Sequence, residues 1–176
     1  MPRKGHYISI LASVAINHET IPKPYCCIHS DESNSQGLVG DHYDVNSGPI
    51  EVIDVKTLRI REFTFSGTQA PDGWIFVGKG EIAKKTGQKA AVLLNNGAAS
   101  FCPLLQDFDG STHLIVRLPD SETVYTISYI SVYCYQYGVD FGHVNFRLLP
   151  EQVSIPAFIP PLKSSPNDPD SSIICN

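Results

Sequence analysis

Cys134 is the residue of this chain whose type and setting are best suited to chemistry. It lies in the sequence Ser-Val-Tyr-Cys-Tyr, residues 131–135, within the longest stretch rich in β-branched and aromatic residues, 124–137. Alternate side chains of a strand point to opposite faces, so Ile130, Val132 and Cys134 share one face. A thiol on such an apolar face could change redox state or ligate a haem iron. It could also simply pack, because free cysteine is among the most buried residue types.

The other four cysteines follow no known metal or redox spacing. They are Cys26, Cys27, Cys102 and Cys175, which form neither a Cys-x-x-Cys motif nor a zinc pattern. Because Cys26 and Cys27 are adjacent, we expect that they do not readily bridge to each other. Placed on mobile arms, Cys26, Cys27 and Cys175 should react quickly if reduced. The pairing of these residues and the redox compartment stay open.

A glycine-rich segment resembles a nucleotide-binding motif. Residues 78–83 read Gly-x-Gly-x-x-Ala directly after the apolar run 74–77. A dinucleotide site also needs a βαβ unit and an acidic residue about 20 positions further on. Gly87 interrupts the one segment that could be helical, 81–94, and the required carboxylate is missing. We therefore interpret the segment as a turn leaving a strand, and a dinucleotide-dependent oxidoreductase is the weakest of the functional hypotheses.

The histidines offer no metal site. None of the six forms a His-x-x-x-His pair or a cluster with cysteine. We expect His113 to begin a strand with its ring in solvent, and His42 to pair with Asp41 or Asp44 at the surface. No Gly-x-Ser-x-Gly elbow supports a serine hydrolase.

The length and composition indicate one globular domain with a substantial hydrophobic core. The chain has 176 residues, 42% of them hydrophobic, and a formal charge of −5. Clustered Lys and Arg are absent, which argues against nucleic-acid binding. No run approaches the roughly 18 apolar residues of a membrane-spanning helix. Arg3 and Lys4 followed by the short apolar run 7–16 form a weak candidate signal segment.

Strand signals dominate the middle of the chain. Besides 124–137, alternating or continuous apolar runs occupy residues 50–53, 57–61, 74–77, 113–118 and 139–146. The first two, joined by a turn at 54–56, predict a hairpin, and a turn at Gly138 precedes the last. We predict an all-β fold, an antiparallel β sandwich or flattened barrel with at most one or two short helical turns. The stretch from Val124 to Cys134 should form a central strand.

One phase change interrupts this pattern. Leu58 and Ile60 share a face, but Phe63 and Phe65 fall in the opposite phase. Either a bulge near Glu62 resets the register or both faces are covered.

The strand signals lie between two segments of different composition. Residues 1–36 lack periodicity and are predicted to form a flexible N-terminal arm. Six of the 13 prolines lie in the last 27 residues, so 151–176 is predicted to be a Pro/Ser-rich tail. Residues 37–150 remain as the folded β domain.

Several ordered motifs resemble a known domain family. They are Lys-Thr-Leu-Arg-Ile at 56–60, Phe-Thr-Phe-Ser-Gly at 63–67, Leu-Pro-Asp at 118–120, Ile-Ser-Tyr-Ile-Ser-Val-Tyr-Cys at 127–134 and Val-Asp-Phe-Gly-His-Val at 139–144. Together they resemble the DM-thirteen domain, the small β domain of Skeletor-like proteins, often found beside DOMON domains. The resemblance covers about residues 40–147. Tyr133 stands where the family usually has tryptophan, and Asp140 where it usually has asparagine.

The resemblance implies a non-enzymatic electron-transfer or redox module, extracellular or cell-surface associated. The family's characteristic cysteine falls on Cys134, which is implied to act as a redox-active thiol or as a ligand to a prosthetic group such as haem. The implied partner is a redox protein, with a DOMON-containing protein as the candidate. The alternative hypothesis is an extracellular protein- or glycan-interaction module in which Cys134 is only structural and exposed aromatic loops bind the ligand.

Overall fold

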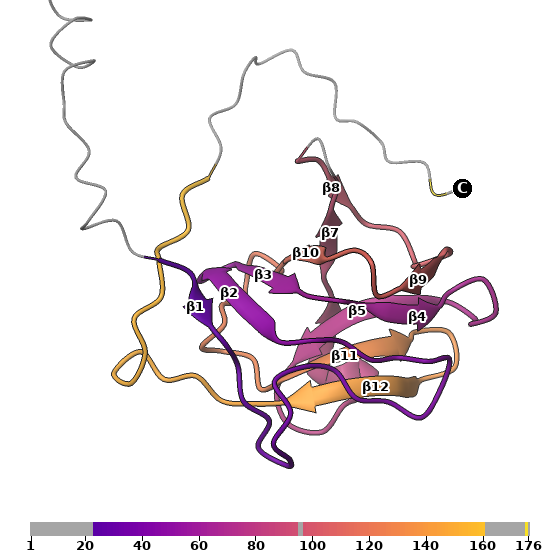
Figure 1. The fold of residues 1–176 in the computed structure, drawn as a ribbon, viewed down its shortest axis with the longest axis horizontal. Helices are drawn as coiled ribbons and strands as arrows, with labels where there is room; N and C mark the ends of the chain where they lie inside the picture. Colours follow the sequence, from indigo (N-terminus) through magenta and orange to yellow (C-terminus); the bar gives the residue numbers. More distant parts are fainter. Residues whose placement is uncertain (1–22, 95–96, 161–174, 176) are drawn as a thin grey trace, which may run out of the picture.

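The computed structural model describes residues 23–94, 97–160 and 175, and it is an all-β protein. Antiparallel strands form a six-stranded sheet in the order β1-β2-β3-β10-β7-β8, a four-stranded sheet β12-β11-β5-β6 and a two-stranded sheet β4-β9 (Figure 1). The strands are β1 Tyr25–Cys26, β2 Ile50–Asp54, β3 Thr57–Ile60, β4 Thr64–Ser66, β5 Gly73–Gly78, β6 Gly87–Lys89, β7 Ala91–Leu93, β8 Ala99–Ser100, β9 Asp107–Asp109, β10 Leu114–Arg117, β11 Tyr129–Cys134 and β12 Val139–Asn145. The sheets pack as a sandwich, as the sequence predicted.

The core lies between the two larger sheets. Val52, Leu58 and Val116 from the six-stranded sheet are fully buried, as are Ile130 and Val132 from β11. Burying such aliphatic side chains contributes about 1.5–3 kcal/mol each. The period-two alternation therefore places the apolar faces of both sheets toward each other.

Most of the predicted strands are confirmed. β2 and β3 form the expected hairpin, with an irregularity between Val52 and Asp54. β5 is buried at every position, as expected for a continuous apolar run between glycines. The single helical element among the described residues is a 3₁₀ turn, Lys84–Thr86.

The predicted strand from Val124 to Cys134 is too long. β11 begins only at Tyr129, because residues 123–126 form a turn. There the Thr126 amide donates to the Thr123 carbonyl at 3.1 Å, and the Thr123 amide donates to the Thr126 hydroxyl at 2.9 Å. Threonine hydroxyls compete in this way for backbone groups that a strand would use. The central position of β11, between β12 and β5, is confirmed.

The alternation of buried and exposed residues changes at Glu62 because the chain passes there from one sheet to another. Leu58 and Ile60 lie on β3 of the six-stranded sheet, while Phe65 lies on β4, which pairs with β9. Glu62 between them has a φ of +50°, a conformation that turns the chain sharply. The two phases therefore serve two different sheets and not one bulged strand.

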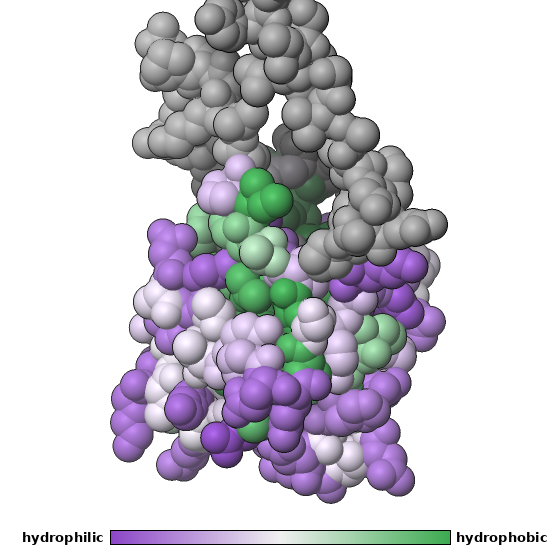
Figure 2. All heavy atoms as spheres, turned by 90° about the vertical axis from the view of Figure 1, so that its left-hand side faces the viewer, coloured by the Kyte–Doolittle hydropathy of each residue, from purple (hydrophilic) through white to green (hydrophobic). Residues whose placement is uncertain are grey.

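Residues assigned to the two arms contact the sandwich. β1 pairs with β2, and Cys27 and Ile28 next to it are buried. At the other end, the Pro156 carbonyl accepts a hydrogen bond from the Val55 amide at 3.0 Å. The face that carries β1 shows a narrow strip of apolar residues flanked by polar ones (Figure 2). The candidate signal segment and residues 161–174 lie outside the described residues. The described part of the chain contains no helix with the length and hydrophobicity needed to cross a membrane.

Candidate functional site

Cys134 is enclosed at the end of β11. Its side chain is 0% exposed and joins Ile130 and Val132 in the main core, as the alternation predicted. The residues opposite it in the sheet are Gly73 on β5 and Val139 on β12. Among the described residues it is the one cysteine that forms no disulfide.

An aromatic wall lies beside this end of β11. A Cβ atom at Gly73 would come within 2.7 Å of the Phe65 ring, so the glycine leaves the space that the ring fills. The Phe65 ring centroid is 6.2 Å from the Phe63 centroid and 6.2 Å from that of Phe141. Phe65 thus covers the cross-strand neighbour of Cys134 with an apolar surface.

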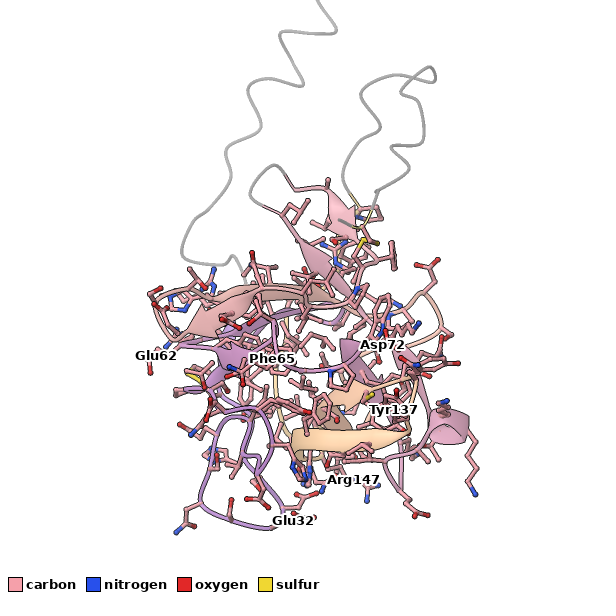
Figure 3. All side chains as sticks on the ribbon, turned by 90° about the vertical axis from the view of Figure 1, so that its right-hand side faces the viewer. Glu32, Glu62, Phe65, Asp72, Tyr137 and Arg147 are labelled. Atoms are coloured by element: carbon pink, nitrogen blue, oxygen red, sulfur yellow. A yellow bond between two sulfur atoms is a disulfide. The ribbon has the colours of Figure 1, made fainter. Side chains whose placement is uncertain are left out.

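The chain reaches solvent directly after Cys134. Tyr135 is 38% exposed and Tyr137 is 66% exposed. The Gly138 amide donates to the Cys134 carbonyl at 2.8 Å, and Gly138 has a φ of +67°, which glycine adopts without penalty. The Gln136 amide donates to the Asp72 carboxylate at 2.9 Å, and Asp72 and Tyr137 lie at the same end of the molecule (Figure 3). The buried thiol is therefore one residue away from an exposed, hydrogen-bonded turn, residues 135–138.

The opposite face of β11 carries a second aromatic cluster. Phe76 stacks on Tyr133 with ring centroids 4.7 Å apart, and Tyr129 packs beside them. The Tyr129 hydroxyl lies 3.0 Å from the Thr86 hydroxyl. Burial raises the pKa of both Tyr129 and Tyr133 above the ordinary value. β11 is consequently covered on both faces, which its sequence of alternating aliphatic and aromatic residues dictates.

Alkaline pH should destabilise the protein through these two tyrosines. In the unfolded chain both ionise near pH 10, whereas in the folded state their raised pKa keeps them neutral. Stability is therefore complete below about pH 10 and falls as the pH rises above it. Unfolding followed by circular dichroism should coincide with the appearance of their tyrosinate absorbance. The pair of changes Tyr129→Phe and Tyr133→Phe should flatten this pH dependence, and an unchanged slope would contradict the assignment.

A polar network on β11 and β12 was not predicted from the sequence. The buried Ser131 hydroxyl donates to Asp140 Oδ1 at 2.7 Å, and Asp140 Oδ2 lies 2.5 Å from His143 Nδ1. His143 Nε2 is 3.5 Å from a carboxylate oxygen of Glu32. Ser131 bonds to the carboxylate and not to the imidazole, so the arrangement lacks the serine–histidine bond of a nucleophilic triad. It ties the loop around Glu32 to β12. The one sequence signal was an acidic residue, Asp140, where the family usually has asparagine.

The glycine-rich segment is a turn, as interpreted from the sequence. Gly78 ends β5, Gly80 has a φ of +87°, and the 3₁₀ turn follows where a dinucleotide site would have a helix. β6 then returns antiparallel to β5, so no βαβ unit forms here.

His113 lies as expected, but His42 does not pair with Asp41 or Asp44, and its ring instead packs edge-on against Phe141, with centroids 6.4 Å apart. His113 is exposed before β10 and its Nδ1 accepts a bond from the Glu62 amide at 3.3 Å. Within the described ranges, no three His, Cys, Asp or Glu side chains gather in a way that could hold a metal ion.

The cysteine pairing corrects one expectation. Cys26 and Cys27 are bridged to each other despite being adjacent, and Cys102 is bridged to Cys175 with their Cα atoms 5.4 Å apart. The prediction that neighbouring cysteines would not pair is therefore wrong. Cys26 is the last residue of β1 and is exposed, and Cys27 follows it and is buried.

A haem held by Cys134 does not fit the packing around this residue. An iron–thiolate bond requires the sulfur to face a space that admits the porphyrin. Cys134 is instead fully enclosed by the main core. The thiol without a bound iron is the group whose chemistry this site supports.

The fold and the site define a small antiparallel β-sandwich domain with a single enclosed thiol. The chain belongs to the DM13 (DM-thirteen) family, described as "Electron transfer DM13", which it matches over residues 37–146. It is 31% identical over 133 residues to Protein Skeletor, isoforms B/C and isoforms D/E, of Drosophila melanogaster. The match covers 76% of this chain but only 15% and 8% of those two relatives. No solved structure matches. At the level of the family, the domain is a redox module.

Proposed function

We propose that this domain is an electron-transfer module in which Cys134 is the group that exchanges the electron. The observation that carries the proposal is the position of the thiol. Cys134 is the one unpaired cysteine of the described residues, it occupies the cysteine position of the family motif, and it ends the central strand one residue from an exposed turn. Because Cys134 forms no disulfide, its thiol can lose an electron without breaking a covalent bond to another residue.

Enclosure decides what kind of exchange is feasible. A partner's sulfur cannot reach a side chain that is 0% exposed, so thiol–disulfide exchange at Cys134 is disfavoured. The proposed step is a one-electron oxidation. The thiol gives up one electron, which a redox protein accepts, and one proton, which passes to water at the adjacent exposed turn, and it becomes a thiyl radical. The exposed turn 135–138 is the nearest surface on which that protein could dock.

The setting proposed for this reaction is extracellular or cell-surface. Two disulfides among the described residues support it, since disulfides persist in oxidising compartments and are rare in the cytosol. The proposed partner is a redox protein, with a DOMON-containing protein as the candidate. No bound substrate is transformed in this scheme, so the module is not an enzyme.

Cys134→Ser should abolish electron exchange while leaving a folded protein. The substitution buries an unpartnered hydroxyl and should lower the free energy of unfolding by about 1–3 kcal/mol. Val132→Thr is the matched control, because Val132 is equally buried two residues away on the same face. It should cost a similar amount and retain exchange. Mediated voltammetry on folded protein measures the exchange. Equal currents from wild type and Cys134→Ser would contradict the proposal.

A face that carries a cluster of lysine and aromatic side chains, in which Lys84 and Tyr135 are exposed, Lys89 is half-buried and Trp74 is buried, favours a second candidate function, binding of a protein or glycan. Lys89 Nζ lies 3.8 Å from the Trp74 ring centroid and 4.2 Å from that of Tyr135, and Lys84 Nζ lies 4.8 Å from Tyr135. Rings with ammonium groups above them are suited to anionic ligands. In this function Cys134 would only pack.

Trp74 reports on binding at this face, because it is the sole tryptophan of the chain. A sulfated polysaccharide should change its fluorescence, and a neutral polysaccharide of equal length should not. Lys89→Ala should weaken the response roughly tenfold or more, as expected for loss of a charge-assisted contact. Lys23→Ala, at an exposed lysine that precedes β1 in the other large sheet, serves as the control. If neither polysaccharide changes the Trp74 fluorescence, this face does not bind anionic glycans.

A further inference from the structure

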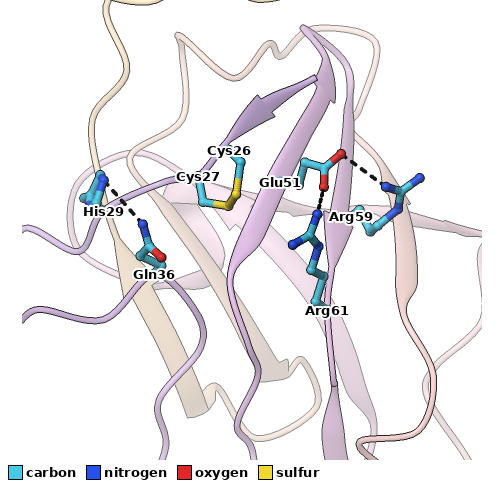
Figure 4. Close-up of a disulfide and its surroundings, with 7 residues drawn as sticks. All are labelled: Cys26, Cys27, His29, Gln36, Glu51, Arg59 and Arg61. Atoms are coloured by element: carbon cyan, nitrogen blue, oxygen red, sulfur yellow. Dashed lines mark hydrogen bonds and ion pairs between the residues drawn. A yellow bond between two sulfur atoms is a disulfide. The ribbon is translucent and has the colours of Figure 1, made fainter. Parts of the chain in front are cut away.

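The disulfide between Cys26 and Cys27 lies at an accessible edge of the fold. Cys26 belongs to β1, the outermost strand of the six-stranded sheet, and is exposed. Cys27 is 1% exposed and faces the core. Both precede the part of the chain that matches the family, residues 37–146. The bond between them, seen in Figure 4, thus joins an exposed residue to a buried one.

The Cys26–Cys27 disulfide contributes little to the stability of the fold. A disulfide stabilises mainly by closing a loop in the unfolded chain, and the effect grows with the length of that loop. Cys102–Cys175 spans a sequence separation of 73, whereas Cys26–Cys27 spans a separation of 1. The adjacent pair therefore restricts the unfolded chain very little, and its presence at the surface calls for another role.

The charges beside the pair favour a departing thiolate. Glu51 is the residue opposite Cys26 in the sheet, and it is buried beneath two arginines. Arg59 Nη1 lies 3.1 Å from Glu51 Oε1, and Arg61 pairs with the other carboxylate oxygen (Figure 4). Two guanidinium groups against one carboxylate give this ion-paired cluster a net charge of +1, at the strands β2 and β3 beside β1. Positive charge stabilises thiolates and speeds their release from a disulfide.

We infer that Cys26–Cys27 is a thiol–disulfide exchange site that accepts two electrons from a dithiol. One thiolate of the dithiol attacks the exposed sulfur of Cys26, forms a new S–S bond and breaks the bond to Cys27, whose thiolate takes up a proton. The second thiol of the dithiol then loses its proton and attacks its own partner sulfur in the mixed disulfide, which releases Cys26 as a thiol. The dithiol ends as a disulfide, and the pair ends as two thiols. This reaction is independent of Cys134.

Dithiothreitol under native conditions tests the exchange. Alkylation after quenching and peptide mass spectrometry should show Cys26 and Cys27 reduced in folded protein and joined again after dithiothreitol is removed under air. The result should be the same in wild type and in Cys134→Ser, so failure of the proposed electron transfer leaves this test intact. Reduction that requires denaturant, or two alkylatable thiols at these positions before any reductant is added, would overturn the inference.

Single variants test which sulfur is attacked. Cys27→Ser leaves the exposed Cys26 thiol, and Cys26→Ser leaves the buried Cys27 thiol. With oxidised glutathione as the probe, Cys27→Ser should form the mixed disulfide roughly tenfold or more faster. Equal rates, or a faster Cys26→Ser, would overturn the assigned order of attack. The double change Cys26→Ala and Cys27→Ala, which buries no hydroxyl at the enclosed position 27, should change the Tm little, whereas Cys102→Ala with Cys175→Ala should lower it. An equally large fall in Tm on removal of the Cys26–Cys27 bond would show that this disulfide stabilises the fold.

Discussion

Alkylation of Cys134 by a maleimide should be at least about a thousandfold slower in the folded protein than in denatured protein. The thiol is 0% exposed, so it reacts only when the core around it opens. Opening free energies of core strands approach the global stability, and about 5 kcal/mol corresponds to a factor of roughly 10³–10⁴.

The pairing of the other cysteines makes this measurement clean. With both disulfides intact, Cys134 is the one thiol of the described residues, so the label reports it alone. The rate can be followed by intact mass. Labelling within the time needed for the denatured protein would place the sulfur at the surface. The end of β11 would then be accessible to solvent, and thiol–disulfide exchange with a partner would replace the one-electron step as the proposed reaction.

Phe65→Ala should lower the free energy of unfolding by about 3–5 kcal/mol and partly expose Cys134 to the reagent. Phe65 is 1% exposed, and removing its ring leaves a cavity that the surroundings refill only in part. That cavity lies against Gly73, the residue opposite Cys134, where no side chain can move in to fill it. Labelling of Cys134 should therefore accelerate beyond what the lost stability explains. Chemical denaturation and the labelling rate measured together give both quantities.

Phe76→Ala is the matched control for this substitution. Phe76 is 0% exposed and equally large, but it lies in the second aromatic cluster on the other face of β11. It should cost a similar 3–5 kcal/mol or so, and the labelling of Cys134 should follow global stability alone. If Cys134 is labelled equally fast in the two variants once their difference in stability is taken into account, Phe65 does not shield the thiol from the reagent.

The elements that local patterns could predict are those with strong alternation or short turns. The β2–β3 hairpin follows from two alternating runs around the turn at 55–56, and β5 from a continuous apolar run bounded by glycines. The direction of Cys134 follows in the same way from the period of two along β11. These features depend on residues close in sequence, which is why the sequence alone was sufficient.

The features that were missed depend on contacts between distant residues. Glu62 turns the chain from one sheet into another, and nothing near it in sequence states which strand will pair with β4. The Ser131–Asp140–His143 network requires the exact register of β11 on β12, including its irregularity after Val132. The misfit of haem at Cys134 depends on the packing of Phe65 at Gly73, the residue opposite Cys134, and is likewise non-local.

Electron paramagnetic resonance of the folded protein, frozen after one-electron oxidation, tests whether Cys134 carries the electron. We expect a sulfur-centred radical whose hyperfine pattern changes when cysteine is deuterated at Cβ, and which is absent from Cys134→Ser. Val132→Thr should give the wild-type signal. Tyr133, next to Cys134 on the opposite face, is the obvious competitor. A signal that responds to deuterated tyrosine and persists in Cys134→Ser would contradict the account.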